Sequence, residues 1–294
     1  MTDPPRPSGL PEPLASLERC AVMGIVNVTP DSFSDGGRWF APEDAIARGM
    51  RLLDEGADLL DVGGESTRPG AQRVGIDEEA RRVLPVVAGL VERGAIVGID
   101  TMRSEIARQA VEAGAVIVND VSGGLADPEM AGVVAEVGAA YVCGHGGPSS
   151  REVDAAGSDC DVVARVRADL AARLSELEAA GILAGRIVLD PGLGFSKTDA
   201  EDVILLSQMR ELSALGFPLM IGASRKRFLG AALAGTDGQI RAVGDRDAAT
   251  IAVTALAAAA GAWAVRVHEA AGSSDAVRIA KFWRATPHEG HKSH

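Results

Sequence analysis

IVGIDTMRSEIARQAVEAGAVIVND, residues 96–120, contains two short apolar runs separated by a segment of helical periodicity. We predict strands at 96–100 and 116–119 and a helix at 103–113, because apolar runs of this length are typical of buried strands. A strand, a helix and a second strand in this order form a unit whose two strands are parallel. Each run ends with a polar side chain, Asp100 in the first and Asn119 in the second.

The same alternation recurs along the rest of the chain. The predicted strands span 22–27, 59–62, 96–100, 116–119, 140–143, 187–190, 219–222 and 263–267. The predicted helices lie near 43–55, 77–93, 103–113, 128–137, 160–180, 199–214, 245–260 and 273–284. This pattern favours an α/β fold with a single (β/α)8 TIM barrel, and an open doubly wound sheet is the competing topology.

Length and composition fit one barrel domain at residues 20–285. The chain has 294 residues, of which 47% are hydrophobic, and such barrels run to about 250 residues. The proline-rich residues 1–19 are predicted to be a disordered leader, and residues 286–294 a flexible tail. Residues 248–265 are uncharged, but their alanine, threonine and glycine content favours a buried helix and strand over a membrane span.

The charge indicates which classes of partner to exclude, and the cysteine content indicates the cellular compartment. The formal net charge of −12 argues against nucleic acid and membrane surfaces as partners, because both are themselves negative. The three cysteines are widely spaced and lack the paired spacing of a zinc site or a disulfide framework. Because the N-terminus also lacks the apolar core of a signal peptide, we predict a cytoplasmic protein.

Polar side chains follow nearly every predicted strand. In a barrel, the C-terminal ends of the strands meet at one rim, which carries the active site. Asp and Asn at such positions also cap helices, and for any single residue that interpretation is equally good. Their convergence on a rim with glycine-rich loops favours a site, whose candidate residues are Asn27, Asp61, Glu65, Asp100, Asn119, Asp120, His145, Asp190, Ser224, Lys226, Arg266 and His268.

A few cations could hold an anion at this rim of an acidic protein. Lysine is scarce, and Lys226 follows the small residues of 222–224, which favours a ligand contact over a solvated helix start. Arg266 and His268 lie two positions apart near one predicted strand and therefore face the same side. This spacing favours a shared anion site over a histidine buried in the core. Nearby cations are Arg68, Arg225 and Arg227.

Seven motifs of this chain resemble those of dihydropteroate synthases. The two longest are GIVNVTPDSFSDGG at 24–37 and DVGGESTRPG at 61–70. The shorter ones are IDT at 99–101, VNDVSGG at 118–124, LDPGLGFSK at 189–197, GASRKR at 222–227 and RVH at 266–268. The resemblance covers about residues 21–285 and is far more specific than a lone glycine-rich loop.

The resemblance implies a transferase of folate biosynthesis. In that reaction, 6-hydroxymethyl-7,8-dihydropterin diphosphate and p-aminobenzoate give 7,8-dihydropteroate and pyrophosphate. Mg²⁺ accompanies the diphosphate, and Asn27 would supply it with an oxygen ligand of the kind that this hard ion prefers. The resemblance also implies a homodimer and inhibition by sulfonamides.

The resemblance assigns roles to individual positions. The residues implied for pterin binding are Asp100, Asn119, Asp190, Phe195, Gly222 and Lys226. Those implied for diphosphate binding are Asn27, Thr67, Arg68, Arg266 and His268. Those implied for p-aminobenzoate binding are Phe33, Thr67, Pro69, Phe195 and Ser224. Catalytic roles are implied for Asp35, Arg68 and Lys226, with the first two motifs forming loops that close over the site and exclude water.

One departure from the family and two alternatives remain open. Gly144 stands where a methionine is expected beside the pterin ring, so Gly144→Met should tighten pterin binding if the space is empty. It should weaken binding if Cys143 or another neighbour already fills that space. The alternatives are a non-catalytic pterin-binding homologue and a corrinoid-linked methyltransferase. The intact first-loop and second-loop motifs disfavour the former, and the first-loop motif disfavours the latter.

Overall fold

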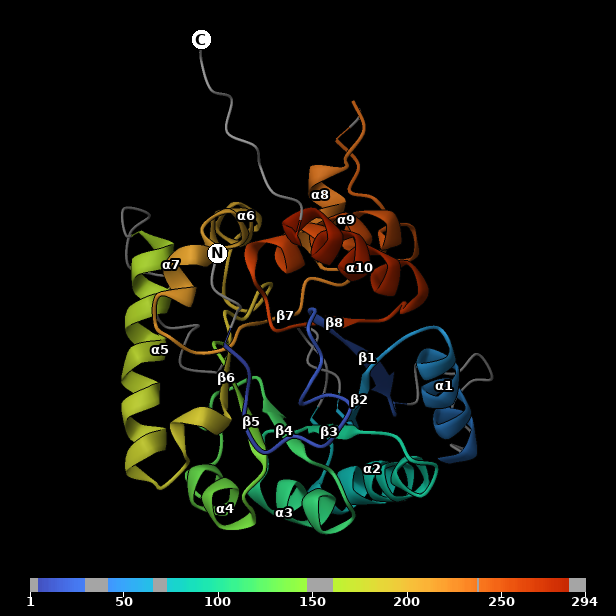
Figure 1. The fold of residues 1–294 in the computed structure, drawn as a ribbon, viewed down its shortest axis with the longest axis vertical. Helices are drawn as coiled ribbons and strands as arrows, with labels where there is room; N and C mark the ends of the chain where they lie inside the picture. The colour runs from blue at the N-terminus through green and yellow to red at the C-terminus, as the bar shows by residue number, and fades with distance from the viewer. Residues whose placement is uncertain (1–4, 30–41, 66–72, 147–160, 237, 286–294) are drawn as a thin grey trace.

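The computed structural model describes residues 5–29, 42–65, 73–146, 161–236 and 238–285 (Figure 1). In this part of the chain, parallel strands alternate with helices as the sequence predicts. The strands are β1 (Ala21–Asn27), β2 (Leu59–Gly63), β3 (Val97–Asp100), β4 (Ile117–Asp120), β5 (Ala140–Gly144), β6 (Ile187–Asp190), β7 (Met220–Ile221) and β8 (Ala264–Val267).

The helices differ from the prediction in two places. The predicted helix at 199–214 is divided into α6 and α7, because the backbone of Gln208 leaves helical dihedral angles. Helix α8 was absent from the prediction because its six residues are too short to show a helical period. The helices are α1 (Pro42–Asp54), α2 (Ile76–Val91), α3 (Ser104–Glu112), α4 (Met130–Val137), α5 (Val162–Ala179), α6 (Asp199–Ser207), α7 (Met209–Ser213), α8 (Arg227–Ala232), α9 (Asp247–Ala260) and α10 (Ala271–Ala285).

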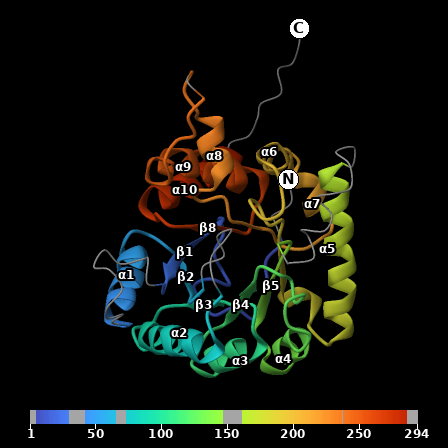
Figure 2. The same cartoon turned by 180° about the vertical axis from the view of Figure 1, so that it is seen from behind.

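The sheet closes on itself. Its strand order is β6-β5-β4-β3-β2-β1-β8-β7, and Leu189 of β6 forms a parallel bridge with Leu219 beside β7. The backbone N–H of Leu189 donates to the carbonyl of Pro218 at 2.8 Å, which joins the two outer strands. Seen from behind, the helices surround the strands (Figure 2). The chain is therefore a (β/α)8 barrel, and the open doubly wound alternative is wrong.

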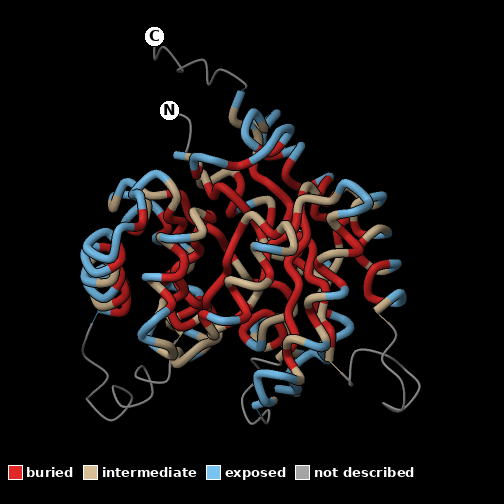
Figure 3. Tube along the Cα trace, turned by 90° about the horizontal axis from the view of Figure 1, so that it is seen from below, coloured by how far each residue is buried: buried red, intermediate tan, exposed pale blue. Residues whose placement is uncertain are grey.

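Side chains alternate between two apolar layers along each strand. Residues such as Val22, Leu60 and Val118 pack between the strands and the helices. Their neighbours in sequence, Met23, Leu59 and Ile117, fill the inside of the barrel near the N-terminal ends of the strands. Buried residues accordingly run along the strands and the inner faces of the helices (Figure 3). This apolar lower half supports the polar rim above it.

The N-terminal segment closes the bottom of the barrel. Leu10 and Leu14 are buried in the same cluster as the interior strand residues. The backbone N–H of Ser8 also donates to the carbonyl of Gly185 at 2.6 Å. The prediction of a disordered leader is therefore wrong for residues 5–19, because two leucines at a spacing of four bury their side chains under the barrel. Residues 1–4 and the expected tail at 286–294 lie outside the described residues.

The uncharged stretch near the C-terminus is a helix followed by a strand, as predicted. Helix α9 packs on α10, and β8 is buried between β1 and β7. Among the helices that the structure describes, none is long and apolar enough to cross a membrane.

The space beside Gly144 is already filled. A Cβ atom at this position would lie 2.6 Å from both the Cα and the carbonyl oxygen of Val121. Backbone atoms cannot move aside as a flexible side chain can, so glycine is required for strands β4 and β5 to approach this closely. The condition under which Gly144→Met would tighten pterin binding is therefore not met, and the neighbour that fills the space is the backbone of Val121 and not Cys143.

We predict that Gly144→Ala lowers the free energy of unfolding by about 1 to 3 kcal/mol, the usual cost of overpacking. The matched control is Gly132→Ala in α4, where an added Cβ meets open space. The control should raise stability by up to about 1 kcal/mol, because alanine favours a helix over glycine. Urea unfolding of both variants checks this, and a Gly144→Ala protein as stable as the wild type would contradict the close approach.

Candidate active site

Polar side chains from five strands converge in the upper half of the barrel. The strand register places Asp61 of β2 beside Gly98, and Asp100 of β3 beside Asn119 of β4. These positions continue the inward-facing series that begins with the apolar residues below them. Asp190 on β6 and Arg266 on β8 complete the ring. The predicted convergence of strand ends at one rim is confirmed for these residues.

Arg266 holds two of the carboxylates together. Its Nε donates to Asp61 Oδ2 and its Nη2 to Asp100 Oδ2, both at 2.6 Å. Asn119 Nδ2 donates to the same oxygen of Asp61 at 2.8 Å. Asp61 is fully buried, and a carboxyl group buried without hydrogen-bond partners would destabilise the fold. One guanidinium therefore fixes side chains from β2, β3 and, through Asp61, β4.

Glycines make room for this cluster. A Cβ at Gly98 would lie 3.1 Å from Asp61 Oδ1, and a Cβ at Gly63 would lie 3.3 Å from Asp100 Oδ2. Both distances are tighter than ordinary contacts, so side chains at these positions would displace the carboxylates. Gly63, at the glycine-rich end of β2, and Gly98, within β3, therefore leave room for the buried carboxylates.

Burial and neighbouring charges shift the pKa values of these groups. Burial raises the pKa of Asp100, although the charge of Arg266 opposes the shift. Burial also raises the pKa of Asp190, whose Oδ1 accepts from the N–H of Gly192 at 2.8 Å. Burial by itself would lower the pKa of Arg266, but Asp61 and Asp100 hold it above its ordinary value. The site therefore keeps a permanent cation beside carboxyls that hold their protons more tightly than usual.

Lys226, Phe195 and Asp190 lie together at the same rim. Lys226 Nζ donates to the carbonyl of Leu193 at 2.6 Å and lies 3.8 Å from the centroid of the Phe195 ring. Burial lowers the pKa of Lys226 to about 8, while the nearby Asp190 carboxylate opposes that shift. A Cβ at Gly222 would lie 3.7 Å from Asp190 Oδ2, so Gly222 lies beside this carboxyl group.

The expected anion-binding residues have different partners here. Arg266 pairs with the two carboxylates, whereas His268 Nδ1 lies 2.9 Å from Ser224 Oγ. The backbone N–H of His268 also donates to Ser224 Oγ, at 3.1 Å. Asn27 ends β1 in register with Gly63. The structure thus brings Ser224 and His268 together, and their roles toward a ligand stay predictions.

Five of the expected site residues lie outside the described part of the chain. They belong to the first two motifs, which were expected to close over the site, and they are Phe33, Asp35, Thr67, Arg68 and Pro69.

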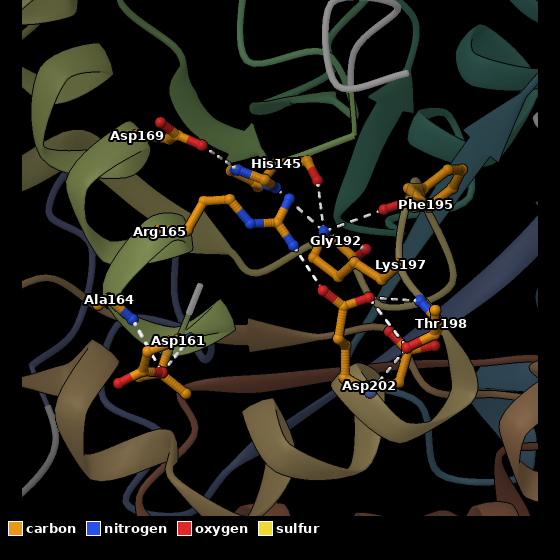
Figure 4. A network of polar contacts seen from close by, with 12 residues as sticks. His145, Asp161, Ala164, Arg165, Asp169, Gly192, Phe195, Lys197, Thr198 and Asp202 are labelled. Carbon is orange, nitrogen blue, oxygen red and sulfur yellow. Dashed lines mark hydrogen bonds and ion pairs between the residues drawn. The ribbon is translucent and has the colours of Figure 1, made fainter. Parts of the chain in front are cut away.

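Two residues of the site were given no specific function by the sequence analysis. Asp61 was only one of the strand-end candidates, although its inward-facing position in the motif DVGGES could have indicated a place in the buried cluster. Lys197 was also visible as one of few lysines, at the end of the motif at 189–197. Its Nζ lies 3.0 Å from His145 Nδ1 and contacts three backbone carbonyls (Figure 4). Spacing along the chain could not show these contacts.

Comparison with known proteins identifies the family of the chain. Residues 23–268 match the family model of pterin-binding enzymes. A dihydropteroate synthase from Mycobacterium leprae is 51% identical over 269 residues, which cover 91% of this chain and 95% of that protein. The chain belongs to the dihydropteroate synthase family.

Solved structures of this family share both fold and sequence with the chain. A Xanthomonas albilineans dihydropteroate synthase with 4-aminobenzoic acid has a TM-score of 0.83 and 44% identity, covering 92% of this chain and 95% of that one. The enzyme from the same organism in complex with 7,8-dihydropteroate has a TM-score of 0.81 and 41% identity, with the same coverage. The family resemblance read from the motifs is therefore confirmed.

Removing the cation at the centre of the cluster tests its role in stability. Arg266→Met should lower the free energy of unfolding by about 3 kcal/mol or more at pH 8, because two buried carboxylates lose their shared partner. The loss should shrink at pH 5.5, since a carboxyl with a raised pKa in the folded state favours folding at low pH and loses that contribution as pH rises.

Urea unfolding at both pH values measures the effect. Arg108→Met is the control, because Arg108 pairs with Glu136 at the surface and should leave stability almost unchanged. An equal loss for Arg266→Met at pH 5.5 and pH 8 would contradict a cost that arises from buried charge.

Proposed function

We propose that this chain joins 6-hydroxymethyl-7,8-dihydropterin diphosphate to p-aminobenzoate and releases pyrophosphate. The observation that carries the proposal is the pairing of Asp100 with Arg266 at one rim. A pterin edge needs carboxylate acceptors, and its diphosphate needs a cation. Both kinds of group occur here within one cluster, and Asp190 and Lys226 lie close by.

The pterin ring would bind through acceptors from three strands. Asp100 and Asp190 would accept hydrogen bonds from the amino group and ring N–H groups of the pterin. Because the amide nitrogen of Asn119 donates to Asp61, its oxygen is left to accept from the ligand. The ring of Phe195 and the space beside Gly222 would line the pocket, and Lys226 would donate to the ring.

Arg266 would change partners when substrate binds. Its Nη2 donates to Asp100 Oδ2 in the structure. Once the pterin donates to Asp100, that guanidinium nitrogen becomes available for the diphosphate. Asp61 keeps the Nε atom and so prevents the cation from leaving the rim. We propose that His268 and, from the second motif, Thr67 and Arg68 complete the diphosphate site.

Mg²⁺ fits this arrangement as an ion that accompanies the diphosphate. The described residues contain no group of three or more His, Cys, Asp or Glu side chains that could hold a metal by themselves. A single amide oxygen from Asn27 suits Mg²⁺, which keeps several waters and binds substrate phosphates. When bound, it would neutralise charge on the leaving group.

The proposed reaction requires the protein to stabilise two opposite charges. The bond between the pterin methylene carbon and the diphosphate oxygen breaks, which leaves a pterin cation and a pyrophosphate anion. Asp100 and Asp190 would stabilise the cation, and Arg266 and His268 the anion. The amine of p-aminobenzoate then forms the new C–N bond and loses a proton. Asp35 and Arg68 are proposed to close the site, and the proposed p-aminobenzoate contacts are Phe33, Thr67, Pro69, Phe195 and Ser224.

We predict Mg²⁺-dependent pyrophosphate release that requires both substrates, and sulfonamide inhibition that excess p-aminobenzoate relieves. Asp190→Asn should weaken binding of 6-hydroxymethylpterin by about 2 kcal/mol or more, because an amide places a donor opposite a ligand donor. Glu136→Gln on the surface of α4 serves as the control and should bind normally. A protein that binds the pterin in calorimetry but releases no pyrophosphate would favour the non-catalytic pterin-binding alternative.

We also propose a homodimer in the cytoplasm. Helices α9 and α10 pack together and expose large apolar side chains, and apolar groups that remain exposed on adjoining helices are typical of an interface. These side chains are Leu256, Ile279, Phe282 and Trp283, of which Leu256 is 69% exposed and Ile279 is 64% exposed. The buried thiols of Cys20 and Cys143 support a reducing compartment.

The double variant Leu256→Glu, Ile279→Glu should sediment as a monomer, because four buried carboxylates per dimer would have to lose water. Val203→Glu on α6 is the control, since it places the same charge on another exposed apolar residue. A dimer that persists in the double variant would locate the interface elsewhere.

A further inference from the structure

Two lysines hold the loop that follows β6 through its carbonyl groups. Gly192, Gly194 and Ser196 have left-handed backbones with φ of 67°, 72° and 48°. This conformation turns successive carbonyl groups in different directions. The carbonyls of Gly192 and Phe195 face Lys197 Nζ at 3.0 Å, and that of Leu193 faces Lys226 Nζ at 2.6 Å.

Four hydrogen-bond acceptors surround the ammonium group of Lys197. Besides the two loop carbonyls, its Nζ lies 3.0 Å from both the carbonyl oxygen and the Nδ1 atom of His145 (Figure 4). An ammonium group has three protons, so these four acceptors fully occupy it. Burial lowers the pKa of Lys197 to about 8, and the carboxylates of Asp202 and Asp190 oppose the shift. Lys197 therefore ties the end of β5 to the loop after β6.

The histidine is held in one orientation by its other neighbour. Lysine has no acceptor, so Nδ1 of His145 accepts and its Nε2 carries the proton. That Nε2 lies 2.9 Å from Asp169 Oδ2 on α5. Burial and the charge of Lys197 lower the pKa of His145. The imidazole of His145 thus connects Lys197 to helix α5.

The same loop positions the groups that face the ligand. The Phe195 ring lies under the Lys226 ammonium, at 3.8 Å from Nζ to the ring centroid. The ring also lines the space beside Gly146, where a Cβ would come within 3.0 Å of it. Because Lys197 fixes the carbonyl of Phe195, it also sets where the ring and the second lysine lie.

We propose that Lys197 is a positioning residue of the reaction, which acts on Lys226 through the loop that carries Phe195 and does not touch the substrate. The inference rests on the proposed function, in which Phe195 and Lys226 contact the pterin. It assigns to Lys197 a contribution to pterin affinity that depends on Lys226.

A double-mutant cycle with 6-hydroxymethylpterin as the calorimetric probe tests this dependence. K197M keeps the length of the side chain but removes its donors, and it should raise the pterin Kd on the order of tenfold. In a K226M background, the same change should raise Kd by less than about twofold, because the group through which Lys197 acts is gone. K197Q, which keeps two donors, should recover part of the affinity. K281M removes a surface lysine that pairs with Glu18 and should bind like the wild type.

The outcomes separate this inference from the proposed function. Equal effects of K197M with and without Lys226, or unchanged affinity in K197M, would overturn the inference. Should K197M fail to fold by circular dichroism, the comparison passes to K197Q, for which wild-type affinity would overturn it equally. A wild-type protein that binds the pterin but releases no pyrophosphate would refute the proposed reaction and leave the cycle on pterin affinity intact.

Discussion

The buried ion pairs of Arg266 with Asp61 and Asp100 are the constraint on which the upper half of the barrel depends. Charges removed from water need partners at close range, because the protein interior does not solvate them as water does. One arginine satisfies two carboxylates, and Asn119 adds a further hydrogen bond to Asp61. Glycines at positions 63 and 98 follow from this constraint, since larger residues would displace the carboxylates.

The two halves of the barrel differ along its axis: the lower half stabilises the fold, and the upper half holds the charged groups. Its lower half is filled by apolar strand residues and closed by Leu10 and Leu14 from the N-terminal segment. Its upper half holds the charged groups, at the ends of the strands where loops can approach a ligand. The apolar half therefore supplies the rigid support that buried charges require to stay in one arrangement.

The loop after β6 illustrates how backbone groups position side chains at the rim. Left-handed residues present its carbonyls to Lys197 and Lys226, and two ammonium groups hold the chain more firmly than neutral donors would. The Phe195 ring lies against one of these ammonium groups, so the conformation of the loop and the position of Lys226 are linked. Lys197 therefore belongs to the same structural unit as Lys226 and Asp190.

The sequence by itself predicted the eight strands, favoured the barrel over an open sheet and indicated the family, because apolar periodicity and motif order are local properties of the chain. It also placed Asp100, Asn119 and Asp190 at one rim, because each follows or ends a predicted strand and the C-terminal ends of the strands meet there. Only the tertiary structure decided that Arg266 pairs with Asp61 and Asp100, which lie 205 and 166 positions away in the chain. The burial of Leu10 and the contact of Gly144 with Val121 were likewise beyond the sequence. Such contacts depend on barrel closure, which brings together residues whose spacing along the chain carries no signal.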